Sequence, residues 1–220
     1  MLRYYHYRKL SKMSRKVYKD IVAGLKEFRR DVSIDKANDF RDIINAVKND
    51  NPHFFYVDWY NVAVSVTNYS AKMTVHFKYT MTKKDAVAVY NRLKLVAPSL
   101  RGKDDYQTIK NVHDYIAKST KYDHAVVDVN GYRQNDHNIM GPLREGLAVC
   151  EGIARTVQFL LRELRVECTY KCGYVNEGTT RGYHAWNIVA IGGKKYKIDV
   201  TWDLADPYGR VSYDYFCTPA

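Results

Sequence analysis

Two strand-like runs in the C-terminal half, residues 183–191 (YHAWNIVAI) and 194–202 (KKYKIDVTW), are separated only by Gly192 and Gly193. A two-residue Gly-Gly loop between such runs is a strong signal for a tight β-hairpin, because both loop positions need positive φ angles. The loop length also fixes the register of the pair, and the register decides which side chains share a face. The chain is therefore expected to contain an antiparallel hairpin with predictable neighbours.

The predicted register places Trp186 opposite Asp199, so His184 and Asp199 become diagonal neighbours on one face. Diagonal partners lie roughly 7–8 Å apart at the backbone, which allows a hydrogen bond between an imidazole and a carboxylate. Asp199 interrupts an apolar alternation, and a buried carboxylate needs a partner. The alternative is an exposed Asp199 that pairs with Lys195 or Lys197.

Cys150 lies in the segment GLAVCEG, just before a helical pattern whose apolar residues recur every three or four positions up to Leu164. The unpaired N–H groups and partial positive charge of a helix N-terminus favour thiolate over thiol and can bind a developing oxyanion. Together with His184 and Asp199, the chain supplies a nucleophile, a base and an orienting carboxylate for thiol chemistry. A buried structural cysteine is the alternative at this position.

The patterns in the rest of the chain predict a mixture of helices and antiparallel strands. The patterns predict helices over about 9–31, 36–50, 82–96 and 104–119, two or three strands within 53–80, a loop over 120–146, and a sheet over about 168–216. His113 falls among the apolar positions of the 104–119 helix, where a structural or surface histidine is expected. The fold class is therefore α+β.

Five motifs together resemble the bacterial branch of the transglutaminase-like superfamily: VHDYI (112–116), GLAVCEG (146–152), HAWN (184–187), YKIDVTWD (196–203) and SYDYF (212–216). The resemblance implies an α+β, papain-like core at 98–220, in which a helix-borne cysteine packs on an antiparallel sheet. An α+β extension of residues 1–97, with helices and a short sheet, would precede it.

The resemblance also implies roles for residues of this chain. Cys150 would be the nucleophile, His184 the general base and Asp199 the orienter of a catalytic triad. Trp186, Trp202 and Tyr183 are candidates for an aromatic, substrate-binding tunnel, with hydrophobic core as the alternative. Asn138 is a candidate second oxyanion donor beside the backbone N–H of Cys150.

The implied reaction is acyl transfer through a cysteine thioester, first of all as a protein-glutamine γ-glutamyltransferase. The substrates would be a protein or peptide, through a glutamine side chain or a peptide amide, and an amine or water as acceptor. The same triad serves a cysteine peptidase or a glutamine deamidase, and a non-catalytic binding module is the third alternative. The motifs do not choose the acceptor.

The net charge of +11 is spread along helices, without a zinc-finger, homeodomain or RNP motif, so no nucleic-acid partner is expected. The charge does fit an acidic partner surface. We expect no membrane span, no metal, because no acidic calcium loop is evident, and no cofactor. Four cysteines do not form a disulfide framework in a chain of this size. The first residues lack a signal-peptide pattern, so a cytoplasmic protein or the mature form of an exported one is expected.

Overall fold

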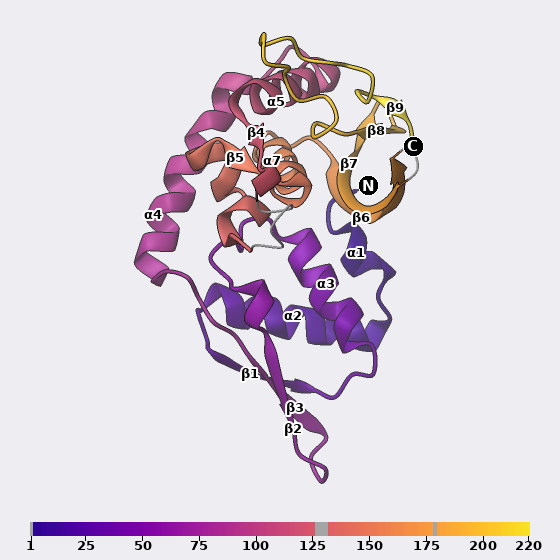
Figure 1. Ribbon diagram of the computed structural model, residues 1–220. Coiled ribbons are helices and arrows are strands. Elements are labelled where there is room, and N and C mark those ends of the chain that lie inside the picture. The colour runs from indigo at the N-terminus through magenta and orange to yellow at the C-terminus, as the bar shows by residue number, and fades with distance from the viewer. Residues whose placement is uncertain (1, 126–131, 178–179) are drawn as a thin grey trace. The chain divides into compact units, whose positions relative to one another are not determined.

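A computed structural model describes residues 2–125, 132–177 and 180–220 of the chain (Figure 1). The described residues form two compact units: an N-terminal unit, Tyr4–Tyr90, and a C-terminal unit of residues 2–3 and 91–220. Each contains helices and an antiparallel sheet, so the fold class is α+β as expected. The division after residue 97 stays a prediction.

The N-terminal unit combines short helices with a three-stranded antiparallel sheet of order β1-β3-β2. Its elements up to residue 76 are α1 (Tyr5–Lys9), α2 (Lys12–Lys26), β1 (Asp31–Asp35), α3 (Phe40–Asp50), η1 (Trp59–Asn61), β2 (Ala63–Val66) and β3 (Lys72–His76). The α2 helix begins at Ser11, whose hydroxyl accepts a hydrogen bond from the Ser14 amide. Buried Asp50 accepts hydrogen bonds from the amides of His6 and Tyr7, which ties α1 to α3.

The elements predicted for this unit are present, with different bounds. The helix predicted over 9–31 is α2, which begins after the Ser11 cap and ends at Lys26, whereas residue 9 ends the separate helix α1 and Asp31 starts β1. The two or three strands predicted within 53–80 are β2 and β3, which pair antiparallel, whereas the first part of that range, 53–62, forms turns, η1 and an isolated bridge between Val57 and Tyr79. Phe54, Phe55 and Tyr56 are buried within this irregular structure, whereas Tyr60 is exposed.

The boundary after Tyr90 falls within a helix, and further helices lie in the C-terminal unit. The α4 helix (Lys83–Leu93) continues as the 3-10 helix η2 (Lys94–Leu100), so the predicted helix over 82–96 changes type near its end. The α5 helix (Asp105–Ser119) begins where the Asp104 carboxylate accepts a hydrogen bond from the Gln107 amide. The α7 helix (Cys150–Glu163) packs against α5 and against the sheet.

The α7 helix is buried on nearly all sides, from Gly152 to Leu161. Its apolar stripe lies in the core as predicted, yet its polar positions are buried too. The guanidinium of Arg155 bonds Glu151 and lies 4.5 Å from the ring centroid of Tyr170. Paired polar groups thus let the helix occupy the centre of its unit.

A four-stranded antiparallel sheet of order β6-β7-β8-β9 covers α7, with β6 and β7 long and strongly curved (Figure 1). Its strands are β6 (Cys168–Glu177), β7 (Thr180–Ile191), β8 (Lys194–Ile198) and β9 (Thr218–Pro219). Gly192 and Gly193 have φ angles of 55° and 79°, and the predicted hairpin register is confirmed for the pairs from Ile191↔Lys194 to Asn187↔Ile198. The predicted pair of Trp186 with Asp199 lies beyond the end of this ladder. The second strand is shorter than predicted: it ends at Ile198, where the chain turns.

The segment 120–146, expected to be a loop, contains small elements among its described residues. These are β4 (Lys121–Tyr122), η3 (Gln134–His137) and the π-helical turn η4 (Gly141–Glu145). The β4 strand pairs in parallel with β5 (Leu147–Ala148), which leads directly into α7. The pairing of β4 with β5 therefore holds in place the residues that lead into Cys150.

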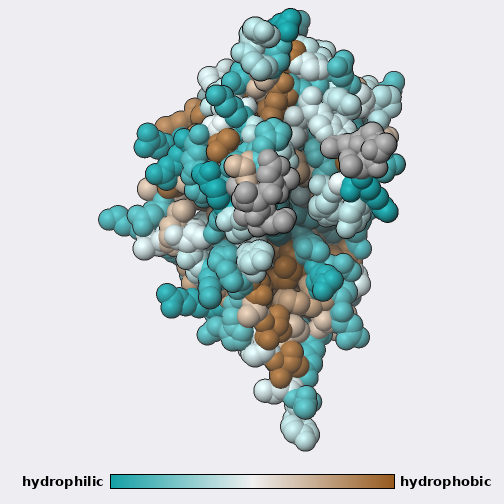
Figure 2. All heavy atoms as spheres, viewed as in Figure 1, coloured by the Kyte–Doolittle hydropathy of each residue, from teal (hydrophilic) through white to brown (hydrophobic). Residues whose placement is uncertain are grey.

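Hydrophilic and intermediate side chains dominate the face shown in Figure 2, with hydrophobic ones in a narrow strip and isolated spots. Within the described ranges, no helix has the length and apolar character of a membrane span. All four cysteines, each in the described part of the chain, are free thiols.

Candidate functional site

Cys150 is the first residue of α7 and is partly exposed. The preceding residue, Val149, has no side-chain cap, so the first amides of the helix are not satisfied by a capping group. The amide of Val149 donates to the carbonyl of Asp136, which fixes the chain as it enters the helix. Gly152 permits this approach, because a Cβ there would lie 2.2 Å from the Asp136 carbonyl oxygen.

The structure brings Cys150, His184 and Asp199 together. His184 lies on β7, and its Nε2 donates a hydrogen bond of 2.8 Å to Oδ2 of Asp199, the residue that follows β8. The Cys150 thiol lies close enough to the same imidazole to raise its pKa. Because Nε2 is engaged with Asp199, Nδ1 is the ring nitrogen left for the thiol.

The neighbours of His184 decide its protonation. Burial opposes a charge on the ring, but the hydrogen bonds with Asp199 and Cys150 outweigh it and raise the pKa of His184 to about 9. At neutral pH the imidazole is therefore protonated next to the thiol. This places a positive charge beside the candidate nucleophile.

Two indoles lie alongside His184. Trp202 stacks on the imidazole with ring centroids 4.5 Å apart and an interplanar angle of 7°. Trp186 lies 6.2 Å from the imidazole at 20°. Stacking restricts rotation of the imidazole, so its two nitrogens keep their separate partners.

Asp199 is fully buried, so the alternative of an exposed Asp199 is wrong. The lysine of that alternative is nevertheless present, since Lys197 Nζ lies 3.7 Å from Asp199 Oδ2. In the part of the chain that is described, Asp199 Oδ1 has no hydrogen-bond partner. One carboxylate oxygen thus faces both His184 and Lys197.

A second buried histidine–aspartate pair supports the first, and the sequence analysis did not predict it. His113 is a structural residue: its Nε2 bonds Asp203 Oδ2 at 3.1 Å, while Asp203 Oδ1 accepts from the amide of Tyr215 at 3.1 Å. The carbonyl of Tyr215 in turn accepts from the amide of Asp199. Asp203 therefore connects α5 to the segment that holds Asp199. The available signal was the pair of motifs VHDYI and YKIDVTWD.

The other predicted site residues lie in different settings. Tyr183 is exposed, and its hydroxyl donates a hydrogen bond of 2.9 Å to Cys172 Sγ. Cys172 and Cys150 both pack against the cluster of Ala154, Tyr170 and Ala185.

Asn138 is nearly buried. Its side chain bonds the Gln134 carbonyl and the Met140 amide, so it organises the loop before α7. The substrate-binding roles of Trp186, Trp202 and Tyr183, and the oxyanion role of Asn138, stay predictions.

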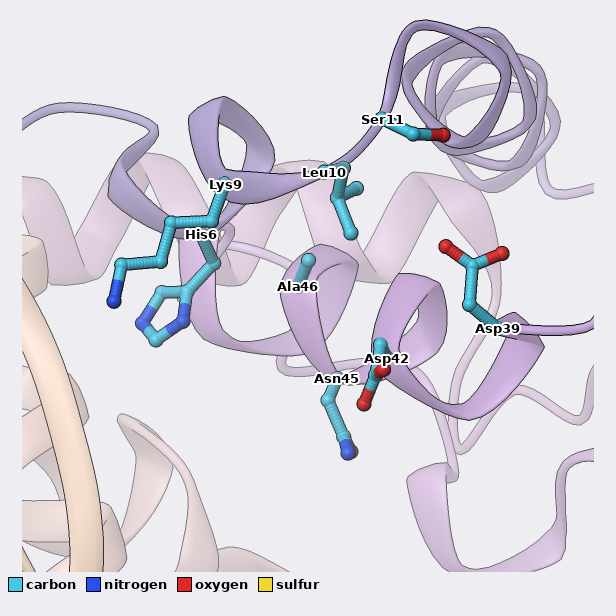
Figure 3. A pocket seen from close by; sticks show the side chains of 8 residues that line it. All are labelled: His6, Lys9, Leu10, Ser11, Asp39, Asp42, Asn45 and Ala46. Atoms are coloured by element: carbon cyan, nitrogen blue, oxygen red, sulfur yellow. The ribbon is translucent and has the colours of Figure 1, made fainter.

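A separate cavity of about 300 Å³ lies within the N-terminal unit. Figure 3 shows His6 and Lys9 of α1 on one side and Asp39 and Asp42 on the other. None of the residues predicted as a site lines this cavity. Across residues 2–125, 132–177 and 180–220, no group of three or more histidine, cysteine or acidic side chains is arranged to hold a metal ion.

Comparison with known proteins gives one family. The sequence model of the transglutaminase-like superfamily matches residues 94–207, which include Cys150, His184 and Asp199. No curated protein matches the chain. A solved structure described as a TGase is 16% identical with a TM-score of 0.47, and the alignment covers 84% of this chain and 54% of that one.

A protein from Cytophaga hutchinsonii, described as a cysteine protease, is also 16% identical, with a TM-score of 0.43. That alignment covers 70% of this chain and 66% of the other. The present chain spans about half the length of the TGase structure that it matches.

Proposed function

The chain belongs to the transglutaminase-like superfamily, and on that premise we propose that it transfers acyl groups through a thioester on Cys150. The observation that carries the proposal is the 2.8 Å hydrogen bond from His184 to Asp199, with Cys150 against the same imidazole at the start of α7. The three groups then act as nucleophile, acid–base group and orienter.

The first half of the reaction forms the thioester. The Cys150 thiolate attacks the carbonyl carbon of a carboxamide, a C–S bond forms, and the carbonyl oxygen becomes an oxyanion. The first N–H groups of α7 donate hydrogen bonds to that oxyanion. His184 then gives a proton to the amide nitrogen, the C–N bond breaks, and ammonia or an amine leaves.

The second half releases the product. An incoming amine or water gives a proton to the neutral His184 as it attacks the thioester, and Cys150 leaves as a thiolate. We propose a glutamine side chain of a protein or peptide as donor and a primary amine as acceptor, the transglutaminase type of reaction. The indoles of Trp202 and Trp186 beside His184 support this choice, because apolar walls disfavour water at the thioester.

The test is incubation with a glutamine peptide and a labelled primary amine, with ammonia release followed in parallel. We expect label incorporation together with ammonia release. Ammonia without label would identify water as the acceptor and a deamidase, whereas cleavage of the peptide without either would identify a peptidase.

The matched control compares two thiols. Cys150→Ala should abolish turnover, whereas Cys217→Ala, which removes a partly buried thiol near the C-terminus, should retain it. Equal activity in the two variants would contradict the proposed role of Cys150 and leave a binding module as the better description.

A further inference from the structure

Lys197 contacts three of the groups that surround His184. Its Nζ lies 3.7 Å from Asp199 Oδ2, 4.9 Å from the ring centroid of Trp186 and 4.8 Å from that of Trp202. The Lys197 side chain is 23% exposed. The ammonium therefore lies against the back of the proposed triad, over two indole faces that attract cations.

The position of Lys197 follows from the hairpin. Lys197 pairs with Ile188 of β7 and lies two residues before Asp199, which directly follows β8. Residues two apart in an extended chain point to the same side, so the two side chains can meet. The neighbouring Lys195 is also on this face of β8 but is exposed. Two lysines of one strand thus differ in whether they reach Asp199.

Asp199 Oδ2 faces two cations whenever His184 is protonated, because His184 Nε2 and Lys197 Nζ lie against the same oxygen. Two positive charges this close repel each other, and the repulsion weakens the hold of His184 on its proton. When His184 is neutral, Lys197 is the cation that still compensates the buried carboxylate.

We propose that Lys197 is a positioning residue that makes the His184 imidazolium a stronger acid and compensates the buried carboxylate of Asp199 when His184 is neutral. This rests on the proposed function of the site, in which His184 must give its proton to a leaving amine. The titratable or charged groups that the described residues place against His184 and Asp199 are Cys150 from α7, His184 from β7, Lys197 from β8 and Asp199 itself.

The test is the pH dependence of Cys150 alkylation, which needs no substrate. Iodoacetate is an anion, so its rate falls at alkaline pH when the imidazolium beside the thiolate loses its proton, and neutral iodoacetamide serves as the reference. After trypsin digestion, Cys150 is read by mass in the peptide of residues 145–155, which contains no other cysteine.

Lys197→Met removes the charge but keeps a long apolar stem between the indoles. We expect the alkaline limb of the iodoacetate profile to move up by about one pH unit, because the repulsion on His184 is gone. Lys197→Arg keeps the charge and should show the wild-type profile. Lys195→Met removes a charge of the same sign from the same strand and should also show the wild-type profile.

A lysine that only fills space between the indoles would leave the limb of Lys197→Met in place, and that result would overturn the inference. So would an equal movement in Lys195→Met, because the effect would then be one of net charge. If Lys197→Met does not fold, Lys197→Gln provides the same comparison. The outcome is separable from the proposed function, since alkylation reports the Cys150–His184 pair whether or not the chain transfers acyl groups.

Discussion

Replacing Asp199 with asparagine isolates what the buried carboxylate does to His184. The amide keeps the shape of the side chain but removes the charge that accepts the hydrogen bond from Nε2. Burial still opposes the imidazolium, so the pKa of His184 should fall from about 9 to its usual 6.5 or below. The pH above which the alkylation of Cys150 by iodoacetate slows should fall with this pKa.

The size of the effect follows from the raised pKa. A change from 6.5 to about 9 corresponds to about 3 kcal/mol, at about 1.4 kcal/mol per pH unit. Because the pKa is higher in the folded than in the unfolded protein, this stabilisation is fully present below pH 6.5. It is lost as the pH rises through 9.

The assay is urea unfolding under reducing conditions at about pH 6 and at about pH 9.5. Between these values the wild type should lose about 3 kcal/mol more unfolding free energy than Asp199→Asn, because folding raises the pKa of His184 only in the wild type. Asp214→Asn, which neutralises an exposed carboxylate, is the control and should follow the wild type. An equal loss in Asp199→Asn and wild type would refute the reasoning.

Two further substitutions test contacts that hold the residues of the site in position. Gly152→Ala should cost about 2–3 kcal/mol of unfolding free energy and slow Cys150 alkylation, because its Cβ would meet the Asp136 carbonyl at 2.2 Å and displace the start of α7. An unfolding curve and an alkylation rate equal to wild type would contradict this. Asp203→Ala should cost about 2–4 kcal/mol by denaturant unfolding, since it leaves His113 and the Tyr215 amide without their partner. Asp214→Ala, at an exposed position, should cost far less.

The hairpin was predictable because its determinants are local. Gly192 and Gly193 both adopt positive φ, and a two-residue loop leaves one register, so the pairing from Ile191↔Lys194 to Asn187↔Ile198 followed from spacing alone. Asp199 lies beyond this ladder, where spacing no longer determines its position. The start of α7 at Cys150 was likewise readable from the apolar repeat that follows it.

What escaped prediction depends on contacts between distant segments. The β1 strand is five residues long and becomes a strand by pairing with β3 some forty residues later in the chain, from Asp31↔His76 to Asp35↔Lys72. The burial of the polar face of α7 depends on partners from neighbouring elements, such as the Tyr170 ring beside Arg155. The spacing of apolar residues along the sequence does not show which side chains of other elements will contact these residues.

Lys197 shows the same limit of prediction from sequence, here at the candidate site. The sequence offered His184 or a lysine as alternative partners of Asp199, because an alternation pattern gives faces but not distances. The structure places both against one oxygen. The curvature and turn after Ile198 decide this, and they depend on the contacts of Asp199 with Tyr215 and of Asp203 with His113.

The central claim is that acyl groups pass through a thioester on Cys150, and the most direct test is to trap it. Wild type would be mixed with a glutamine peptide that is turned over, quenched in acid and digested, and the peptide of residues 145–155 would be weighed. The account predicts the added mass of the acyl group on Cys150, removed by hydroxylamine and absent in Cys150→Ala. Turnover of that peptide with no acyl group on Cys150, or turnover that persists in Cys150→Ala, would contradict it.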